Sequence, residues 1–88
     1  AIVFDDADLD HAAKTLAGAK FRNAGQVCVS PTRFLVQESL YEPFVEKFVA
    51  ASKAIRVGDG TEAGVQMGPL AHDRRVPWIE GLVADARQ

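Results

Sequence analysis

The sequence is poor in sulfur and has no excess of charge. Its 88 residues include one cysteine, Cys28, and one methionine, so no internal disulfide can form. A lone cysteine is typical of reducing compartments, and we therefore expect a cytoplasmic protein. The net charge of −2 lacks the basic excess that binds nucleic acid or anionic membranes, and no apolar run approaches the length of a membrane span. We expect neither nucleic acid nor a membrane as a partner.

The residues that usually bind metal ions do not form a recognisable site. The two histidines, His11 and His72, lie far apart in the chain and belong to no cluster of cysteines or carboxylates. Four aspartates near the beginning lack the spacing of a calcium loop and are typical of the solvated first turn of a helix; they are Asp5, Asp6, Asp8 and Asp10. We therefore expect no metal.

The first forty residues alternate between strand and helix patterns. Residues 1–4 form a short apolar run, and residues 33–37 form a second one. Between them, apolar residues recur at helical spacing from Leu9, with Asp8 in the position of an N-cap and Gly25 where a left-handed residue would end the helix. This order predicts a βαβ unit with parallel strands and therefore an α/β fold.

The second half continues the alternation. Ser39 and Glu42 have the spacing of a capping box before a helix whose apolar stripe includes Phe44 and Phe48. A glycine-rich loop follows, and its GDGTEAG segment is not a dinucleotide motif because Ala63 replaces the last glycine. A final helix is expected to begin around residues 75–77 with its apolar residues inward. These are Val76, Ile79, Val83 and Ala86, and we expect Trp78 and Phe48 in a core or a subunit interface.

Cys28 admits two interpretations from its surroundings. Free cysteine is among the most buried residue types, and Val27 and Val29 flank it as they would in a core. However, Cys28 follows the end of a helix and precedes a strand, where backbone N–H groups are free to face a reacting oxygen. The surroundings of Cys28 are therefore compatible both with a nucleophile and with a packing residue.

Cys28 belongs to a pattern of an aromatic residue, Asn, Gly, Gln and Cys, formed by Phe21, Asn23, Gly25, Gln26 and Cys28. The pattern favours the nucleophile through its resemblance to a known family. The segment FRNAGQVCVSPTRFLVQ resembles the nucleophile segment of the aldehyde dehydrogenase superfamily, and AIVFDDADLDHAA, YEPFVEKFV and VGDG…MGPL resemble its flanking parts. The resemblance therefore covers essentially the whole chain, and residues 27–33 are most similar to bacterial enzymes of the succinate-semialdehyde type.

The resemblance implies a function for Cys28 and a fold around it. In the family, a cysteine thiolate adds to an aldehyde to give a thiohemiacetal, hydride passes to NAD⁺ or NADP⁺, and water hydrolyses the resulting thioester to a carboxylic acid. The backbone N–H of Cys28 would stabilise the oxyanion. Ser30 and Thr32 follow Cys28 closely enough to reach a substrate pocket, but we expect neither to have that role. The implied fold is a doubly wound, mostly parallel three-layer sheet, and the implied assembly is a homodimer or homotetramer.

The resemblance also implies that much of the enzyme is absent from these residues. The family's general-base glutamate, its oxyanion asparagine and its cofactor-binding domain have no counterpart here, and Glu38, Glu42 and Glu46 do not match the family's motifs. Asn23 is expected to end the helix and Gln26 to position the turn. We expect residues 1–88 to be an internal piece of a catalytic domain that is inactive alone.

Two other classes of protein are also compatible with the residues around Cys28. A thiol-dependent hydrolase would require His11 or His72 beside Cys28 as its base. A non-catalytic α/β interaction module would bury Cys28 as a packing residue.

Overall fold

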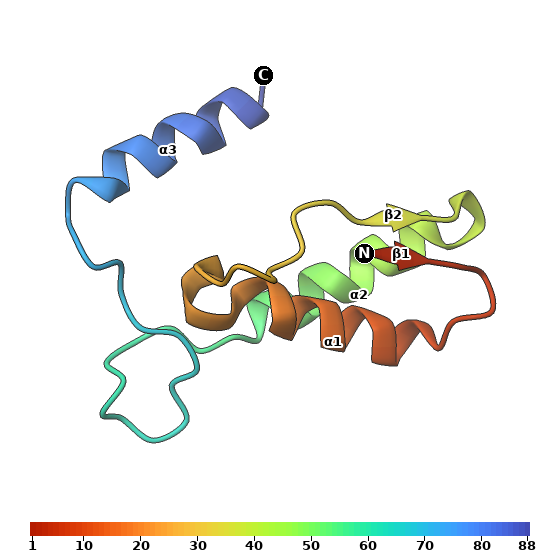
Figure 1. Cartoon of the computed structure of the whole chain (residues 1–88), viewed down its shortest axis with the longest axis horizontal. Helices are drawn as coiled ribbons and strands as arrows, with labels where there is room; N and C mark the ends of the chain where they lie inside the picture. Colours follow the sequence, from red (N-terminus) through yellow and green to blue (C-terminus); the bar gives the residue numbers. More distant parts are fainter.

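A parallel pair of strands joined by a helix forms the centre of the molecule. The computed structural model describes all residues, 1–88, and its β1 (Ile2–Val3), α1 (Leu9–Phe21) and β2 (Leu35–Val36) follow one another along the chain. Ile2 pairs with Leu35 and Val3 with Val36, in parallel. The predicted βαβ unit and α/β class are therefore confirmed, although each strand is shorter than its apolar run (Figure 1).

Helix α1 begins as its sequence predicts. The Asp8 side chain accepts the backbone N–H of His11 at 3.0 Å, which satisfies one of the first-turn donors that lack a partner within the helix. Asp10 in the same turn forms an ion pair with Lys47, whose ammonium lies 2.5 Å from the carboxylate. This hydrogen bond raises the pKa of Lys47 above its usual value. The ion pair links α1 to α2 (Tyr41–Lys53).

The core lies between the strand pair and the two helices. Val3, Ala13 and Phe44 are buried together and bring β1, α1 and α2 into contact. The rings of Phe34 and Phe48 extend this cluster with their centroids 5.1 Å apart. Phe48 is partly buried and packs against the core, in agreement with the expectation of a core or interface position.

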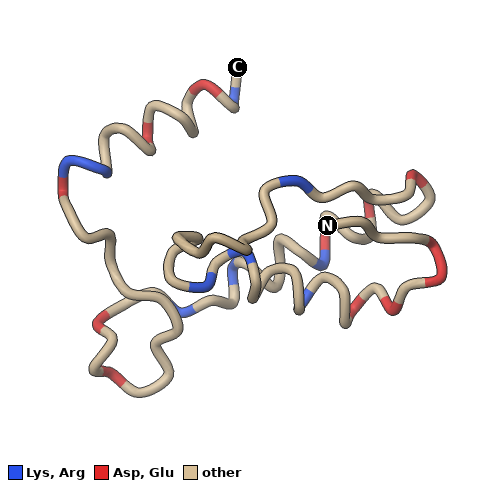
Figure 2. The backbone as a smooth tube through the Cα atoms, in the orientation of Figure 1, with Lys and Arg blue, Asp and Glu red and all other residues tan.

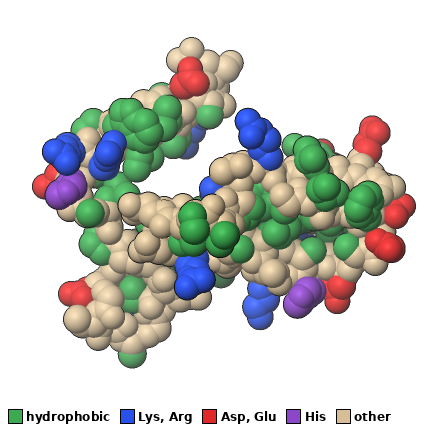
Figure 3. Space-filling model, in the orientation of Figure 1, with side chains coloured by type: hydrophobic (Ala, Val, Ile, Leu, Met, Phe, Trp, Pro, Cys, Tyr) green, Lys and Arg blue, Asp and Glu red, His purple; other side chains and the backbone are tan.

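The opposite side of the strand pair has no cover. Ile2, Phe4 and Leu35 are each more than 60% exposed, because successive strand residues point to opposite faces and their neighbours occupy the core side. Figure 3 shows hydrophobic side chains on the visible surface around the strand pair and along α3 (Arg75–Ala86).

The start of α2 differs from the capping box that the sequence predicts. A short 3₁₀ turn, η2 (Glu38–Leu40), precedes the helix, and no side chain caps it. The N–H of Leu40 donates to the Gln37 carbonyl and the N–H of Tyr41 donates to the Glu38 carbonyl. The capping-box prediction was wrong because α2 begins at Tyr41 with Leu40 at its N-cap, so Ser39 lies within the 3₁₀ turn instead of at the capping position.

The glycine-rich segment is a closed surface loop. Arg56 and Gln66 bring its ends together, since the Gln66 side chain accepts the Arg56 N–H at 3.1 Å and the Gln66 N–H donates to the Arg56 carbonyl at 2.9 Å. At its tip, Asp59 accepts both the backbone N–H and the hydroxyl of Thr61. The two bonds lower the pKa of Asp59 below its usual value.

The last helix lies where the sequence predicts it, but its apolar side is not inward. No residue of α3 is buried, Val76 and Val83 are more than 40% exposed, and Trp78 is 58% exposed. The helix projects away from the β1–α1–β2–α2 body, so most of its apolar residues have nothing to pack against (Figure 1). The expectation of an inward face, and of Trp78 in a core, was therefore wrong for this chain.

Charges of both signs are spread along the backbone. Figure 2 shows acidic residues concentrated after β1, and basic residues at the start of α3 and along α1 and α2. No helix combines the length and the apolar character that crossing a membrane requires.

Candidate functional site

The segment that leads from α1 to Cys28 has an unusual backbone. Immediately after α1, the 3₁₀ turn η1 (Arg22–Gly25) contains three consecutive residues with positive φ: Asn23 at 50°, Ala24 at 55° and Gly25 at 78°. The left-handed conformation predicted for Gly25 is confirmed. For a residue with a Cβ this conformation costs about 1–2 kcal/mol, so Ala24 is strained. Strain of this kind is concentrated at functional segments of proteins.

Asn23 and Gln26 bind one another across this turn. The backbone N–H of Gln26 donates to the Asn23 carbonyl at 3.0 Å, and the Asn23 side-chain amide donates to the Gln26 carbonyl at 3.3 Å. Asparagine tolerates the left-handed conformation better than most residues because its side chain can make such local bonds. The pair fixes the direction in which the chain leaves η1.

Cys28 lies at the centre of the next turn, and its side chain is exposed. The N–H of Ser30 donates to the Val27 carbonyl at 2.9 Å, which places Cys28 and Val29 at the two central positions of the turn. The thiol is free and solvent-exposed. The interpretation of Cys28 as a buried packing residue is therefore not supported.

Three backbone donors around the thiol have no partner within the chain. The N–H groups of Val27, Cys28 and Val29 make no hydrogen bond to any carbonyl or side chain. Unpaired N–H groups beside a nucleophile can bind the oxyanion that forms when the nucleophile attacks a carbonyl. The structure therefore provides the thiol and candidate oxyanion donors in the same turn.

The side chain of Ser30 binds the end of α1. Its hydroxyl donates to the carbonyl of Lys20, in the last turn of α1, at 3.2 Å, and this contact is partly buried. Ser30 is therefore bonded to the protein, while Thr32 is exposed and its hydroxyl has no partner in the chain.

No histidine is bonded to Cys28. His11 lies in the first turn of α1, and His72 lines a hollow of about 350 Å³ together with Ala24, Gln26 and Trp78. Neither imidazole makes a hydrogen bond to the thiol, so the hydrolase alternative gains no support. No group of three His, Cys, Asp or Glu side chains lies together as a metal site would require.

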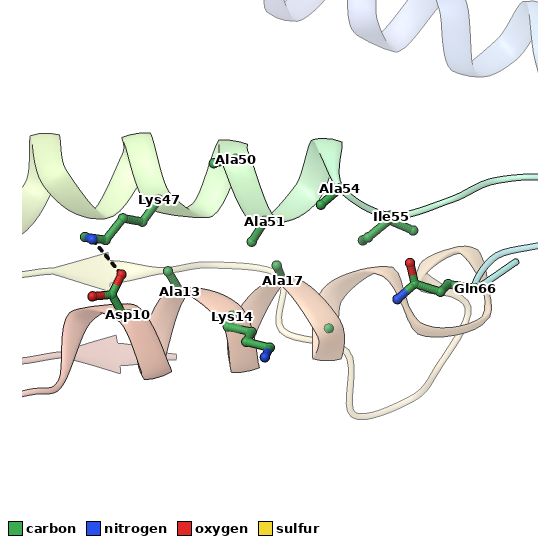
Figure 4. A pocket seen from close by; sticks show the side chains of 11 residues that line it. Asp10, Ala13, Lys14, Ala17, Lys47, Ala50, Ala51, Ala54, Ile55 and Gln66 are labelled. Carbon is green, nitrogen blue, oxygen red and sulfur yellow. Dashed lines mark hydrogen bonds and ion pairs between the residues drawn. The ribbon is translucent and has the colours of Figure 1, made fainter. Parts of the chain in front are cut away.

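The largest hollow lies away from Cys28. It has a volume of about 710 Å³, runs between α1 and α2, and is bordered at one end by the Asp10–Lys47 pair (Figure 4). Five of its eleven lining residues are alanines, among them Ala13, Ala17 and Ala51. It contains no nucleophile and is not part of the candidate site.

Comparison with known proteins identifies the family. The model of the aldehyde dehydrogenase family matches residues 1–88. The chain belongs to the aldehyde dehydrogenase family. It is 49% identical over 85 residues to 3-sulfolactaldehyde dehydrogenase of Pseudomonas putida, which covers 97% of the chain and 18% of that protein. It is 47% identical over 85 residues, with the same coverage, to the succinate-semialdehyde dehydrogenase [NADP(+)] of Escherichia coli.

A solved structure of the family has the same fold over these residues. The chain matches the crystal structure of succinate-semialdehyde dehydrogenase from Burkholderia pseudomallei with a TM-score of 0.86 and 47% identity, over 97% of the chain and 18% of that structure. The chain thus spans less than a fifth of the length of the aldehyde dehydrogenases that it matches.

Two features of the segment from α1 to Ser30 have no counterpart among the expectations from the sequence. Arg22 is exposed in η1, six residues before Cys28, and its guanidinium forms no ion pair. Lys20 contributes its main-chain carbonyl rather than its side chain. Arg22 could have been noticed as a cation next to the motif, whereas no sequence signal marks a backbone carbonyl.

Proposed function

We propose that the protein to which this chain belongs oxidises an aldehyde to a carboxylic acid, with Cys28 as the nucleophile. The observation that carries the proposal is the exposed Cys28 thiol at the centre of a turn with unpaired N–H groups, in a chain of the aldehyde dehydrogenase family. In the overall reaction the aldehyde carbon loses a hydride, which NAD⁺ or NADP⁺ accepts, and gains an oxygen atom from water with release of a proton.

Cys28 supplies the first covalent step. Its thiolate forms a C–S bond to the aldehyde carbon, and the carbonyl electron pair moves to oxygen and produces a tetrahedral oxyanion. Sulfur suits this role because it is intrinsically nucleophilic and partly ionised near neutral pH. After oxidation the carbon is held as a thioester, which water cleaves to release the acid and regenerate the thiol.

The turn around Cys28 is suited to stabilise the oxyanion. Donors that are already oriented when charge develops contribute more to catalysis than donors that must reorganise. The N–H of Cys28 is unpaired and is fixed to the same residue as the nucleophilic sulfur. We assign it as one oxyanion donor.

The chain's own residues do not form a site for the dinucleotide. Asp5 and Asp6 lie in the turn after β1, separated from the strand by Phe4. A dinucleotide-binding unit would have glycines and the pyrophosphate in such a turn, and two carboxylates there repel an anion. The GDGTEAG loop follows α2 instead of a strand. NAD⁺ or NADP⁺ would therefore be held by other residues of the whole protein. The NADP⁺ in the name of the E. coli relative supports this cofactor class.

We propose an aldehyde that carries an anionic group as the substrate. The relatives are named for sulfolactaldehyde and succinate semialdehyde, which carry a sulfonate and a carboxylate respectively. Arg22 adds support from the chain itself, because its exposed guanidinium has no partner and follows α1 in the connection that leads to Cys28. A planar guanidinium binds carboxylate and sulfonate oxygens well.

We further propose that residues 1–88 are part of a catalytic domain, that they are inactive alone, and that the whole protein is a cytoplasmic homodimer or homotetramer. The inactivity follows from the site, since no carboxylate or imidazole is bonded to Cys28 as a base and no dinucleotide site is present. Measuring the 88-residue chain beside the longest natural form of the protein tests this. Activity of the short chain would contradict it.

Aldehyde-dependent reduction of NAD⁺ and NADP⁺ by the longest natural form tests the function. We expect Cys28→Ala to abolish turnover, while Val29→Ala, at the adjacent position that is 80% exposed, leaves it intact. A folded wild-type protein without turnover, or turnover that survives Cys28→Ala, would overturn the proposal.

A further inference from the structure

We propose that Ser30 is a positioning residue that fixes the Cys28 turn to the end of α1. The inference rests on the proposed role of Cys28. It starts from the hydrogen bond between the Ser30 hydroxyl and the Lys20 carbonyl, which joins residues ten apart in sequence.

Ser30 makes two hydrogen bonds, one within the Cys28 turn and one to α1. Its N–H donates to the Val27 carbonyl and closes the turn that contains Cys28 and Val29. Its hydroxyl donates to Lys20, one of the last four residues of α1, whose carbonyls lack partners within a regular helix. One residue therefore both shapes the turn and attaches it to a rigid helix.

The remaining contacts of the turn do not replace this attachment. The Cys28 thiol is exposed, the side chain of Val29 is 80% exposed, and the backbone N–H groups of both residues are unpaired. The bond between Asn23 and Gln26 holds the preceding turn, not this one. Without the Ser30 hydroxyl, the Cys28 turn would have no side-chain hydrogen bond to the rest of the protein.

The residue after Ser30 favours the contact. Pro31 follows directly and restricts Ser30 to an extended backbone. This restriction lowers the number of conformations available to Ser30, so fixing its hydroxyl on the Lys20 carbonyl costs less conformational entropy.

Loss of the Ser30 hydroxyl is expected to slow the chemical step of the reaction. A mobile turn places the sulfur and its N–H donor correctly for a smaller fraction of the time, and small misplacements of reacting groups are costly. We expect Ser30→Ala to lower kcat about five- to tenfold, with KM changed less than about twofold. Ser30→Thr keeps a hydroxyl and an extended backbone preference, and we expect it to restore most of kcat.

Ser52 provides the matched control. Its hydroxyl donates to the Phe48 carbonyl at 2.6 Å, so it makes the same kind of contact within α2, away from Cys28. Ser52→Ala should leave kcat unchanged. Equal losses in Ser30→Ala and Ser52→Ala would show a general structural effect and would overturn the proposal, as would a Thr variant that fails to restore activity.

The two proposals can fail separately. Hydrogen–deuterium exchange of the turn, measured on the longest natural form of the protein, does not require turnover. We expect the backbone N–H at position 30 to exchange at least about fivefold faster in Ser30→Ala than in the wild type. Unchanged exchange would overturn the anchoring role, whereas faster exchange in a protein without aldehyde oxidation would contradict only the proposed function.

Discussion

Asn23 and Gln26 hold one another through two hydrogen bonds, one from the Gln26 N–H to the Asn23 carbonyl and one from the Asn23 amide to the Gln26 carbonyl. Ala24 lies between them with a positive φ of 55°. The reciprocal bonds therefore enclose a residue whose conformation is unfavourable for its side chain, and this strained turn immediately precedes the segment with the thiol.

Because Ala24 is strained, replacing alanine with glycine should change the free energy of unfolding in opposite directions at positions 24 and 19. Ala24→Gly removes the Cβ that opposes the left-handed conformation, and we expect the free energy of unfolding to rise by about 1 kcal/mol. Ala19→Gly, at an exposed position within α1, should lower it by about 1 kcal/mol because glycine weakens a helix. Urea unfolding of the two variants and the wild type measures both. Destabilisation by Ala24→Gly would contradict the strain.

Arg22 is expected to select anionic aldehydes. Arg22→Gln removes the charge and keeps a polar side chain, so KM for succinate semialdehyde should rise about tenfold while KM for a neutral aldehyde of similar length changes little. Arg33→Gln is the matched control, since Arg33 is also exposed and unpaired but lies after the Cys28 turn. Steady-state kinetics with both aldehydes measures the effect. An equal rise for the neutral aldehyde, or an equal effect of Arg33→Gln, would contradict a carboxylate contact.

The loop at Asp59 should loosen in acid. The N–H and hydroxyl of Thr61 bind the ionised carboxylate and lower its pKa below the usual 3.8, so their stabilisation is present above pH 3.8 and is lost as the pH falls through the lowered pKa. The Thr61 amide resonance, followed by NMR, should therefore shift at a pH below 3.8. Asp59→Asn, which does not titrate, should abolish that transition, and Thr61→Val should move it towards higher pH. A transition that persists in Asp59→Asn would have another origin.

Local sequence signals predicted the N-terminal half well. The cap at Asp8, the apolar spacing of α1 and the left-handed Gly25 each depend on residues within a few positions, and the structure confirms them. The capping box of Ser39 failed because the 3₁₀ turn Glu38–Leu40 precedes the helix and places Leu40, not Ser39, at its N-cap. A motif of two residues indicates a compatible hydrogen bond but does not fix the residue at which the helix begins.

The sequence by itself determined the α/β order of elements, the position of Cys28 in a connection and the family to which the chain belongs. Only the tertiary structure decided that the Ser30 hydroxyl binds the Lys20 carbonyl, that Ala24 is left-handed, and that the apolar side of α3 stays exposed. The reason is physical: periodicity and capping are interactions between near neighbours in the chain. A bond across ten residues, or the cover on a helix face, depends on where the chain places its other parts.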